Sequence, residues 1–181
     1  MNIEEVKERK FEAILRSDNF TAISDPEGMR ILAEKGYGLV EEKSILLDPI
    51  ETLYLMHRGV IEVKDMNHHT LTFEALLKRL CETDKDLWLK LIVYSDLRKR
   101  GLIVKRGAMS LTFFVDKRGE KVFKRYLVAC LREGSRIGFL ELESFFRRSI
   151  ESDRELIVAI VDKEGNVSYY TVERIVPMRG D

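Results

Sequence analysis

The three histidines of this 181-residue chain are the first candidates for acid–base chemistry or metal binding. His68 and His69 are adjacent, and no cysteine or third histidine accompanies them at the spacing of a metal site. Because adjacent side chains usually diverge, a polar turn is the favoured interpretation. His57 falls near the end of a predicted helix, where an imidazole suits the free carbonyl groups. The histidines therefore predict no metal centre.

A second candidate combines Asp48 with Glu62 and Lys64, which are the residue types of a metal-dependent nuclease. That chemistry needs two acids on neighbouring strands, so that both reach one Mg²⁺ ion. Here a helix is predicted between the two acids. The chain also lacks a phosphate-binding loop, a dinucleotide fingerprint, a nucleophile elbow and a zinc motif. We therefore expect neither a metal nor a cofactor.

Charge is unevenly distributed along the chain, although 31 Lys and Arg balance 31 Asp and Glu. Residues 1–97 carry 13 basic against 19 acidic residues, residues 98–148 carry 14 against 5, and residues 149–181 carry 4 against 7. A local basic block attracts phosphates even in a neutral chain, or it meets an acidic protein partner. Within this block Arg147 and Arg148 follow two phenylalanines. Arginines beside aromatic rings either stack on unpaired bases or form the solvated face of a helix.

Composition is that of a folded cytoplasmic protein, with 45% hydrophobic residues. No apolar run approaches the roughly 18 residues that a membrane span needs. The start of the chain, MNIEEVKERK, is charged and lacks a following apolar segment, so we expect no signal peptide and no membrane partner. Cys81 and Cys130 fit two buried small side chains, and a disulfide between them stays open.

The elements that would position these residues fall into two groups, with a boundary predicted after residue 83. Residues 3–17 have an apolar spacing close to that of a helix. Residues 1–83 are predicted to form a small α+β domain, with short strands at 20–23, 37–40, 44–47 and 60–63 and helices at 29–34, 49–57 and 72–81.

Residues 84–181 are predicted to form an α/β domain. Its first helix spans 84–100 and presents an apolar face that includes Leu87, Leu91 and Leu97. The order of elements is then three strands, a helix and two strands, at 102–104, 111–115, 126–130, 138–150, 156–161 and 167–172. Residues 162–166 would form the hairpin loop between the last two strands.

Residues 94–105, YSDLRKRGLIVK, combine a helix ending in Tyr-x-Asp-Leu-Arg-x-Arg-Gly with a strand containing Val-Lys. This combination resembles a signature of the archaeal tRNA-splicing (tRNA-intron) endonucleases. The apolar strand 156–161, the hairpin 162–166 and Tyr169-Tyr170 resemble the end of the same family domain. Weaker matches at Tyr37-Gly38 and residues 51–55 extend the similarity over about residues 20–177. The resemblance implies a restriction-endonuclease-like mixed sheet flanked by helices in the second domain.

By resemblance, the family reaction is metal-independent RNA cleavage. The ribose 2′-OH attacks the neighbouring phosphate and leaves a 2′,3′-cyclic phosphate and a 5′-OH, which requires a base, an acid and a cation. The family uses Tyr, His and Lys, and we assign the corresponding positions to Ser110, Phe123 and Arg154. Phe123 cannot transfer a proton, Ser110 is less acidic and shorter than Tyr, and Arg154 keeps the charge without the geometry of Lys. We therefore expect this chain to contain no catalytic residue.

The family includes hetero-oligomers of catalytic and structural subunits. By resemblance, the last strand would pair with the same strand of a partner, and the interface candidates on it are Val167, Tyr169, Tyr170 and Val172; an ordinary edge strand is the alternative. Glu133 is the single acidic residue in the loop, residues 132–135, that we match to a family docking loop. Arg147 and Arg174 match two arginines that clamp a bulged base in the family.

Three hypotheses follow. The leading one is a structural, catalytically inactive subunit of the tRNA-splicing endonuclease, which assembles as two copies with two catalytic subunits on bulge-helix-bulge precursor tRNA. The second is an active metal-independent endonuclease with relocated catalytic groups, in which Ser110→Ala and Arg154→Ala would abolish cleavage. The third is a stand-alone RNA-binding protein, which would bind RNA tightly without a partner.

Overall fold

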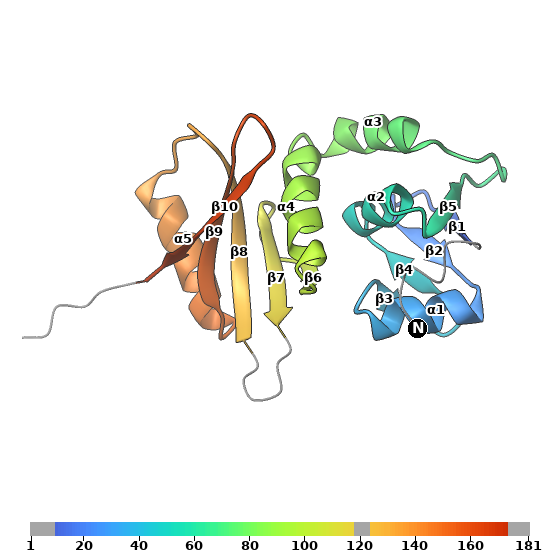
Figure 1. Cartoon of the computed structure of the whole chain (residues 1–181), viewed down its shortest axis with the longest axis horizontal. Coiled ribbons are helices and arrows are strands. Elements are labelled where there is room, and N and C mark those ends of the chain that lie inside the picture. The colour runs from blue at the N-terminus through green and yellow to red at the C-terminus, as the bar shows by residue number, and fades with distance from the viewer. Residues whose placement is uncertain (1–9, 118–123, 174–181) are drawn as a thin grey trace, which may run out of the picture. The chain divides into compact units, whose positions relative to one another are not determined.

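The computed structural model describes residues 10–117 and 124–173 (Figure 1). The chain forms two compact units, residues 1–95 and 96–181, and each contains a five-stranded sheet. The division between the units falls within one helix, and the domain boundary expected after residue 83 stays a prediction. Among the described residues, every helix is too short or too polar to cross a membrane.

The N-terminal unit is built on a mixed sheet with the strand order β3-β4-β2-β1-β5. All its pairs are antiparallel except β1 with β5. Its strands are β1 (Phe11–Leu15), β2 (Thr21–Ile23), β3 (Leu39–Val40), β4 (Ile45–Leu47) and β5 (Ile61–Lys64). Its helices are α1 (Pro26–Glu34), α2 (Pro49–His57) and α3 (Phe73–Thr83).

The helix predicted over residues 3–17 is wrong for residues 11–15, which form strand β1, whereas residues 3–9 lie outside the described residues. Phe11, Ala13 and Leu15 are buried and Glu12 is exposed. That alternation is the period of a strand with one face in the core. A short apolar run of this kind is compatible with the period of a helix and with that of a strand. Its parallel pairing with β5 makes it a strand.

The start of α2 explains two acidic residues of the N-terminal unit. Asp48 accepts hydrogen bonds from the backbone N–H groups of Ile50 and Glu51 at 2.7 and 2.9 Å, so it caps the helix. The buried carboxylate of Glu51 accepts from the N–H groups of Asp48 and Gly38 at 3.2 and 2.9 Å. Gly38 has a φ of +60°, and a Cβ there would lie 2.5 Å from Ile45. Asp48 is therefore structural rather than a metal ligand.

The C-terminal unit confirms the predicted mixed sheet flanked by helices. Its strand order is β10-β9-β8-β7-β6, with β8 and β9 parallel and the other pairs antiparallel. Helix α4 (Leu87–Lys99) leads into it from the N-terminal unit. The remaining elements are β6 (Ile103–Arg106), β7 (Thr112–Lys117), β8 (Lys124–Arg132), α5 (Phe139–Glu151), β9 (Glu155–Val161) and β10 (Val167–Val172).

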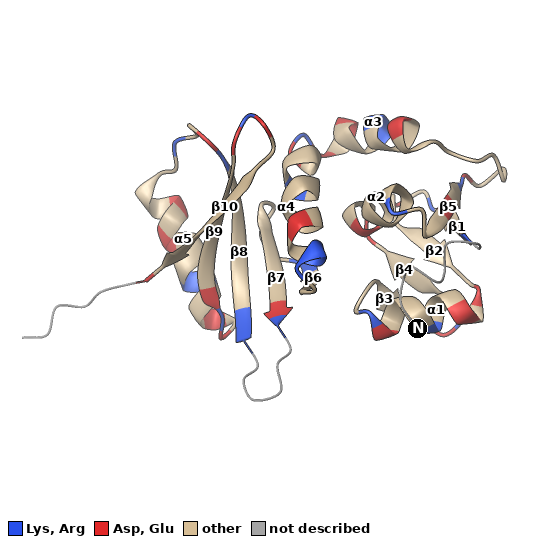
Figure 2. Ribbon diagram, viewed as in Figure 1, with Lys and Arg blue, Asp and Glu red and all other residues tan. Residues whose placement is uncertain are grey.

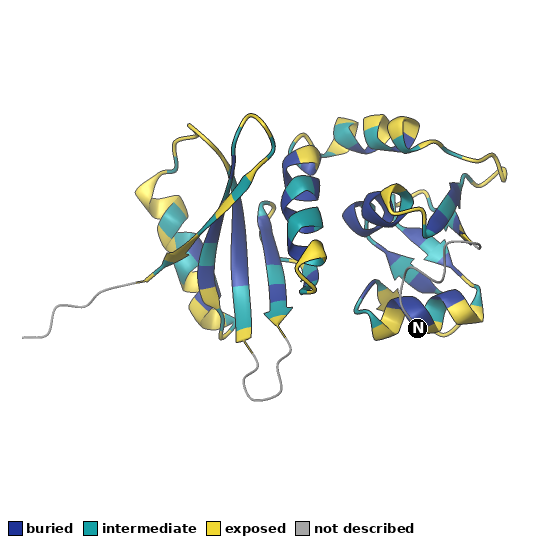
Figure 3. Cartoon of the chain, viewed as in Figure 1, coloured by how far each residue is buried: buried dark blue, intermediate teal, exposed yellow. Residues whose placement is uncertain are grey.

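Helix α5 covers one face of this sheet and closes an apolar core (Figure 3). Phe145 of α5 packs with Leu127, Ala129 and Leu156 of the two central parallel strands. Val172 of the edge strand β10 packs against the same cluster. The core therefore holds β8 and β9 in place under α5. Arg154 is the residue directly before β9.

Candidate functional site

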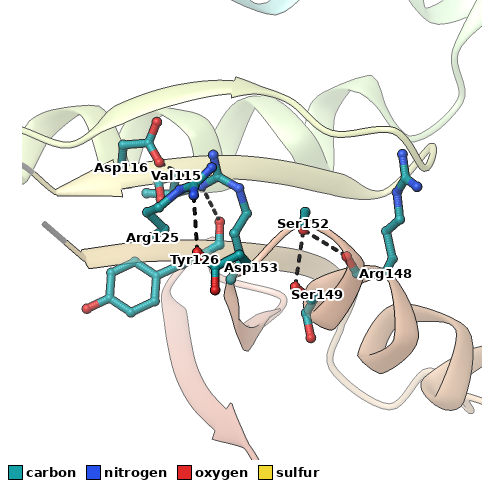
Figure 4. A network of polar contacts seen from close by, with 9 residues as sticks. Val115, Asp116, Arg125, Tyr126, Arg148, Ser149, Ser152 and Asp153 are labelled. Atoms are coloured by element: carbon teal, nitrogen blue, oxygen red, sulfur yellow. Dashed lines mark hydrogen bonds and ion pairs between the residues drawn. The ribbon is translucent and has the colours of Figure 1, made fainter.

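Arg154 directly precedes β9 and contacts the end of β7 and the start of β8. Figure 4 shows its neighbours Val115, Asp116 and Tyr126. Its Nη1 is 2.6 Å from Oδ1 of Asp116 and 3.2 and 3.3 Å from the carbonyl oxygens of Val115 and Tyr126. The guanidinium also lies 4.7 Å from the ring centroid of Phe114. Its side chain is only 9% exposed. Arg154 therefore links the start of β9 to the end of β7 and the start of β8.

The surroundings of Arg154 limit its chemistry. Its charge is balanced by Asp116, and the same nitrogen, Nη1, also donates to the carbonyl oxygens of Val115 and Tyr126. A cation that stabilises a developing phosphate charge must point preorganised donors at that charge. Nη1 would have to leave Asp116 to do so, and that would leave a partly buried carboxylate without its cation. In this structure the side chain acts as a cross-link between strands.

Ser110 lies in the tight turn between β6 and β7. The turn is closed by the N–H of Gly107 donating to the carbonyl of Thr112 at 2.9 Å, and by the Thr112 hydroxyl donating to the carbonyl of Met109 at 2.9 Å. A Cβ on Gly107 would lie 2.2 Å from the Thr112 hydroxyl oxygen, so this close approach requires glycine. Ser110 itself is exposed.

The structure does not bring Ser110 and Arg154 together. Ser110 precedes the start of β7, whereas Arg154 contacts its last residues, Val115 and Asp116. Thr112 pairs with Ala129 and Asp116 with Arg125, so the two ends are four residues apart, or about 13 Å along a strand. The β7 residue that the fold places beside Arg154 is Asp116, which sequence reasoning missed. Phe123 and Arg174 lie outside the described residues.

The two arginines at the end of α5 differ in their surroundings. Arg148 pairs with Glu151 at 3.1 Å, and both side chains are partly exposed. Arg147 is exposed and has no hydrogen bond or ion pair with any residue that the structure describes. Its guanidinium is therefore available to an external anion or aromatic base.

Basic residues also lie at the end of β7 and at the start of β8 (Figure 2). Lys117 and Lys124 are exposed and directly paired across the two strands. Like charges in directly paired positions repel, and an anionic ligand would relieve that repulsion. The two lysines would favour an anion at this end of the sheet, where Asp116 and Asp153 already pair with Arg154 and Arg125.

Strand β10 forms one edge of the sheet and carries four of the five predicted interface side chains, all except Glu133. Tyr170 is 56% exposed, whereas Val167, Tyr169 and Val172 are half-buried. Elsewhere in the same unit, Phe139 and Leu140 at the start of α5 are each 79% exposed. Glu133 is exposed. Its backbone N–H donates to the carbonyl of Val161 at 2.8 Å, which fixes the loop that carries this carboxylate to the end of β9.

Two residues of the Tyr-x-Asp-Leu-Arg-x-Arg-Gly segment hold Tyr169. The Tyr169 hydroxyl donates to Oδ2 of Asp96 at 2.7 Å, and Nε of Arg100 donates to the same oxygen at 2.7 Å. Burial raises the pKa of Asp96, but the hydrogen bonds from Arg100 and Tyr169 outweigh it and hold that pKa below its usual range. Burial and the neighbouring Asp96 raise the pKa of Tyr169. The pair is thus an ionised acceptor and a protonated donor at neutral pH.

The remaining candidates for metal or redox chemistry are separate from these residues. Within residues 10–117 and 124–173, no three His, Cys, Asp or Glu side chains gather as metal ligands would. Nδ1 of His69 lies 3.3 Å from Asp65 in an exposed turn, and His57 packs beside Phe73. Cys81 and Cys130 are free thiols in this structure; Cys130 is buried as predicted, whereas Cys81 is only partly buried, which corrects the prediction for that residue.

Comparisons with known proteins agree with this two-unit fold. The tRNA intron endonuclease N-terminal domain matches residues 11–77, and the catalytic C-terminal domain of the same enzymes matches residues 87–169. The tRNA-splicing endonuclease of Methanococcus maripaludis is 33% identical over 159 residues, covering 86% of this chain and 90% of that protein. That of Pyrococcus horikoshii is 30% identical over 167 residues, covering 92% and 98%. That of Thermococcus kodakarensis is 34% identical over 152 residues, covering 83% and 90%.

The chain therefore belongs to the archaeal tRNA-splicing endonuclease family. The resemblance inferred from the signature at residues 94–105 is confirmed, and the function of the family is tRNA splicing.

Proposed function

We propose that this chain is a structural, non-catalytic subunit of a tRNA-splicing endonuclease, which helps to hold precursor tRNA while a catalytic homologue cleaves it. The observation that carries the proposal is the capture of Arg154 by Asp116 and two strand carbonyls. The residue at the expected position of the catalytic cation is committed to the fold of its own domain.

The other roles of the reaction also lack an occupant. Cleavage through the 2′-OH needs a base and an acid near one phosphate. Ser110 is at the opposite end of β7 from Arg154, and Phe123 has no proton to transfer. The sequence contains no histidine after His69, so the C-terminal unit has none to substitute. These observations favour an inactive subunit over an enzyme with relocated catalytic groups.

The proposed partner is a catalytic subunit of the same family, in a complex of two plus two chains. In the part of the chain that the structure describes, strand β10 has a neighbour on one side only and presents Tyr170 to the surroundings, which suits pairing with the same strand of a related chain. Phe139 and Leu140 add exposed apolar side chains in the same unit. Apolar and aromatic side chains with few charges are typical of the centre of an interface.

The proposal is tested by cleavage of a bulge-helix-bulge precursor tRNA in EDTA, with this chain alone, the catalytic homologue of the same genome alone, and the two mixed. We expect no cleavage by this chain alone and at least a tenfold higher rate in the mixture than with the homologue alone, because assembly completes the RNA-binding surface. Cleavage by the pure chain alone would show that it contains catalytic groups of its own. Tight RNA binding without any complex would favour the stand-alone RNA-binding protein.

Arg147 provides a second prediction, about RNA binding by the assembled complex. Because its guanidinium is unpaired within the described residues, Arg147→Ala should weaken binding of precursor tRNA by roughly fivefold and lower the salt dependence by about one ion. Binding isotherms at several salt concentrations measure both quantities.

The matched control for Arg147 is Arg148→Ala, which removes the same group one residue further along the helix. Arg148 already pairs with Glu151, so its replacement should change affinity less. Equal losses from the two variants would indicate a general charge effect rather than a contact made by Arg147.

A further inference from the structure

We propose that Asp96 and Arg100 are positioning residues for subunit assembly, because they hold Tyr169 and thereby fix the partner-binding strand β10 before a partner arrives. The inference rests on the proposed function, in that it requires β10 to be the strand that meets the catalytic subunit.

The contact joins two segments that are far apart in sequence. Tyr169 lies in the middle of β10, and its hydroxyl reaches Asp96 in the last turn of α4, 73 residues earlier. Arg100 lies beside both partners: it bonds to Asp96, and its guanidinium is 5.3 Å from the centroid of the Tyr169 ring. One acceptor oxygen therefore receives both donors, and the cation lies next to the aromatic ring.

Strand β10 needs this support because it is an edge strand. Its backbone is paired to β9 over six residues, and no strand within residues 10–117 and 124–173 lies on its other side. Side chains alternate along a strand, so Tyr169 and Val172 lie on opposite faces. Val172 packs into the core under α5, and Tyr169 is bound to Asp96. The strand is thus held on both faces of the sheet while its outer edge stays open.

Fixing an open edge strand in advance favours association. A partner strand that adds to the sheet requires a regular row of backbone donors and acceptors. If β10 were loosely held, ordering it on binding would cost conformational entropy and weaken the affinity. A strand that is already ordered avoids this loss. The signature residues Asp96 and Arg100 then act on assembly through Tyr169 without touching the partner.

The test measures the dissociation constant between this full-length chain and the catalytic homologue, far below the unfolding temperature. Tyr169→Phe removes the donor, and Asp96→Ala removes the acceptor. Each should raise Kd by about tenfold, and the double variant should bind no more weakly than either single variant, because both act through one contact. Hydrogen exchange of the β10 amides in the isolated chain should become faster in all three variants.

The matched control is Tyr126→Phe, which removes a tyrosine hydroxyl that has no hydrogen bond among the described residues. Its Kd should stay within about twofold of the wild-type value. A purely structural loss of stability would not change Kd at this temperature, because all variants remain almost fully folded and only the folded state binds.

Two outcomes would overturn the inference. If the wild-type pair forms and Asp96→Ala binds as tightly as wild type, Asp96 has no positioning role, and the proposed function is unaffected. If the effects of Tyr169→Phe and Asp96→Ala add up, Tyr169 contacts the partner directly. Failure of the wild-type chain to bind the homologue would overturn the proposed function itself, and this inference with it.

Discussion

Replacing Arg154 by alanine is expected to lower the free energy of unfolding of the C-terminal unit by about 2–4 kcal/mol. The substitution leaves Asp116 beside two strand carbonyls that have lost their donor. Breaking a fully buried ion pair costs about 3–5 kcal/mol, and the partial exposure of Asp116 places the expected loss somewhat lower. Urea unfolding of the full-length chain measures it.

Arg154→Ala, together with the following variants, separates a structural role of Arg154 from a catalytic one. Arg147→Ala, which removes an exposed arginine, should change stability by less than about 0.5 kcal/mol. Asp116→Ala combined with Arg154→Ala should cost less than the sum of the single changes, because the pair is removed together. If Arg154→Ala instead leaves stability unchanged and abolishes cleavage by the mixture, as Ser110→Ala would under the relocated-site hypothesis, the structural role is contradicted.

The parts of the fold that the sequence predicted correctly have strong local signals. The Asp-Leu-Arg-x-Arg-Gly segment contains the end of helix α4 at Lys99 and the turn at Gly101, whose φ is +78°. Asp162 begins the hairpin before β10 and accepts hydrogen bonds from the N–H groups of Glu164 and Asn166. Turn chemistry of this kind acts within five residues, so it can be recognised without knowledge of the fold.

The parts that could not be predicted depend on pairing between distant residues. The strand at residues 11–15 is fixed by its parallel partner β5, about 50 residues away. Similarly, the assignment of Ser110 rests on the resemblance to the family motif after the preceding strand, whereas the neighbour of Arg154 is set by the register of β7 against β8. The contact of Asp96 with Tyr169 also has no local signal, although both residues lie in recognised motifs. A match to a motif identified these residues, but the sheet decides which of them meet.

The largest loss in the N-terminal unit is expected from Lys90→Ala, at about 3–5 kcal/mol. Lys90 lies in α4 with only 4% of its side chain exposed, and its ammonium pairs with the carboxylate of Asp84 at the end of α3. Alanine removes the cation and also leaves a cavity where the aliphatic stem was packed. Thermal and urea unfolding of the full-length chain measure the effect. Lys85→Ala, at an exposed lysine five residues earlier, is the control and should change stability little.

A replacement that keeps the volume of Lys90 distinguishes its charge from its packing. Lys90→Met retains most of the buried stem, and combined with Asp84→Ala it also removes the unpaired carboxylate. Buried ion pairs replaced by well-packed apolar groups are often neutral or stabilising, so this double variant should recover most of the stability lost in Lys90→Ala. If it is instead as unstable as Lys90→Ala, the ion pair itself would supply the stability. Recovery would mean that the charges mainly define how the end of α3 meets the start of α4, because the pair gives the buried ammonium of Lys90 its partner, the partly exposed carboxylate of Asp84.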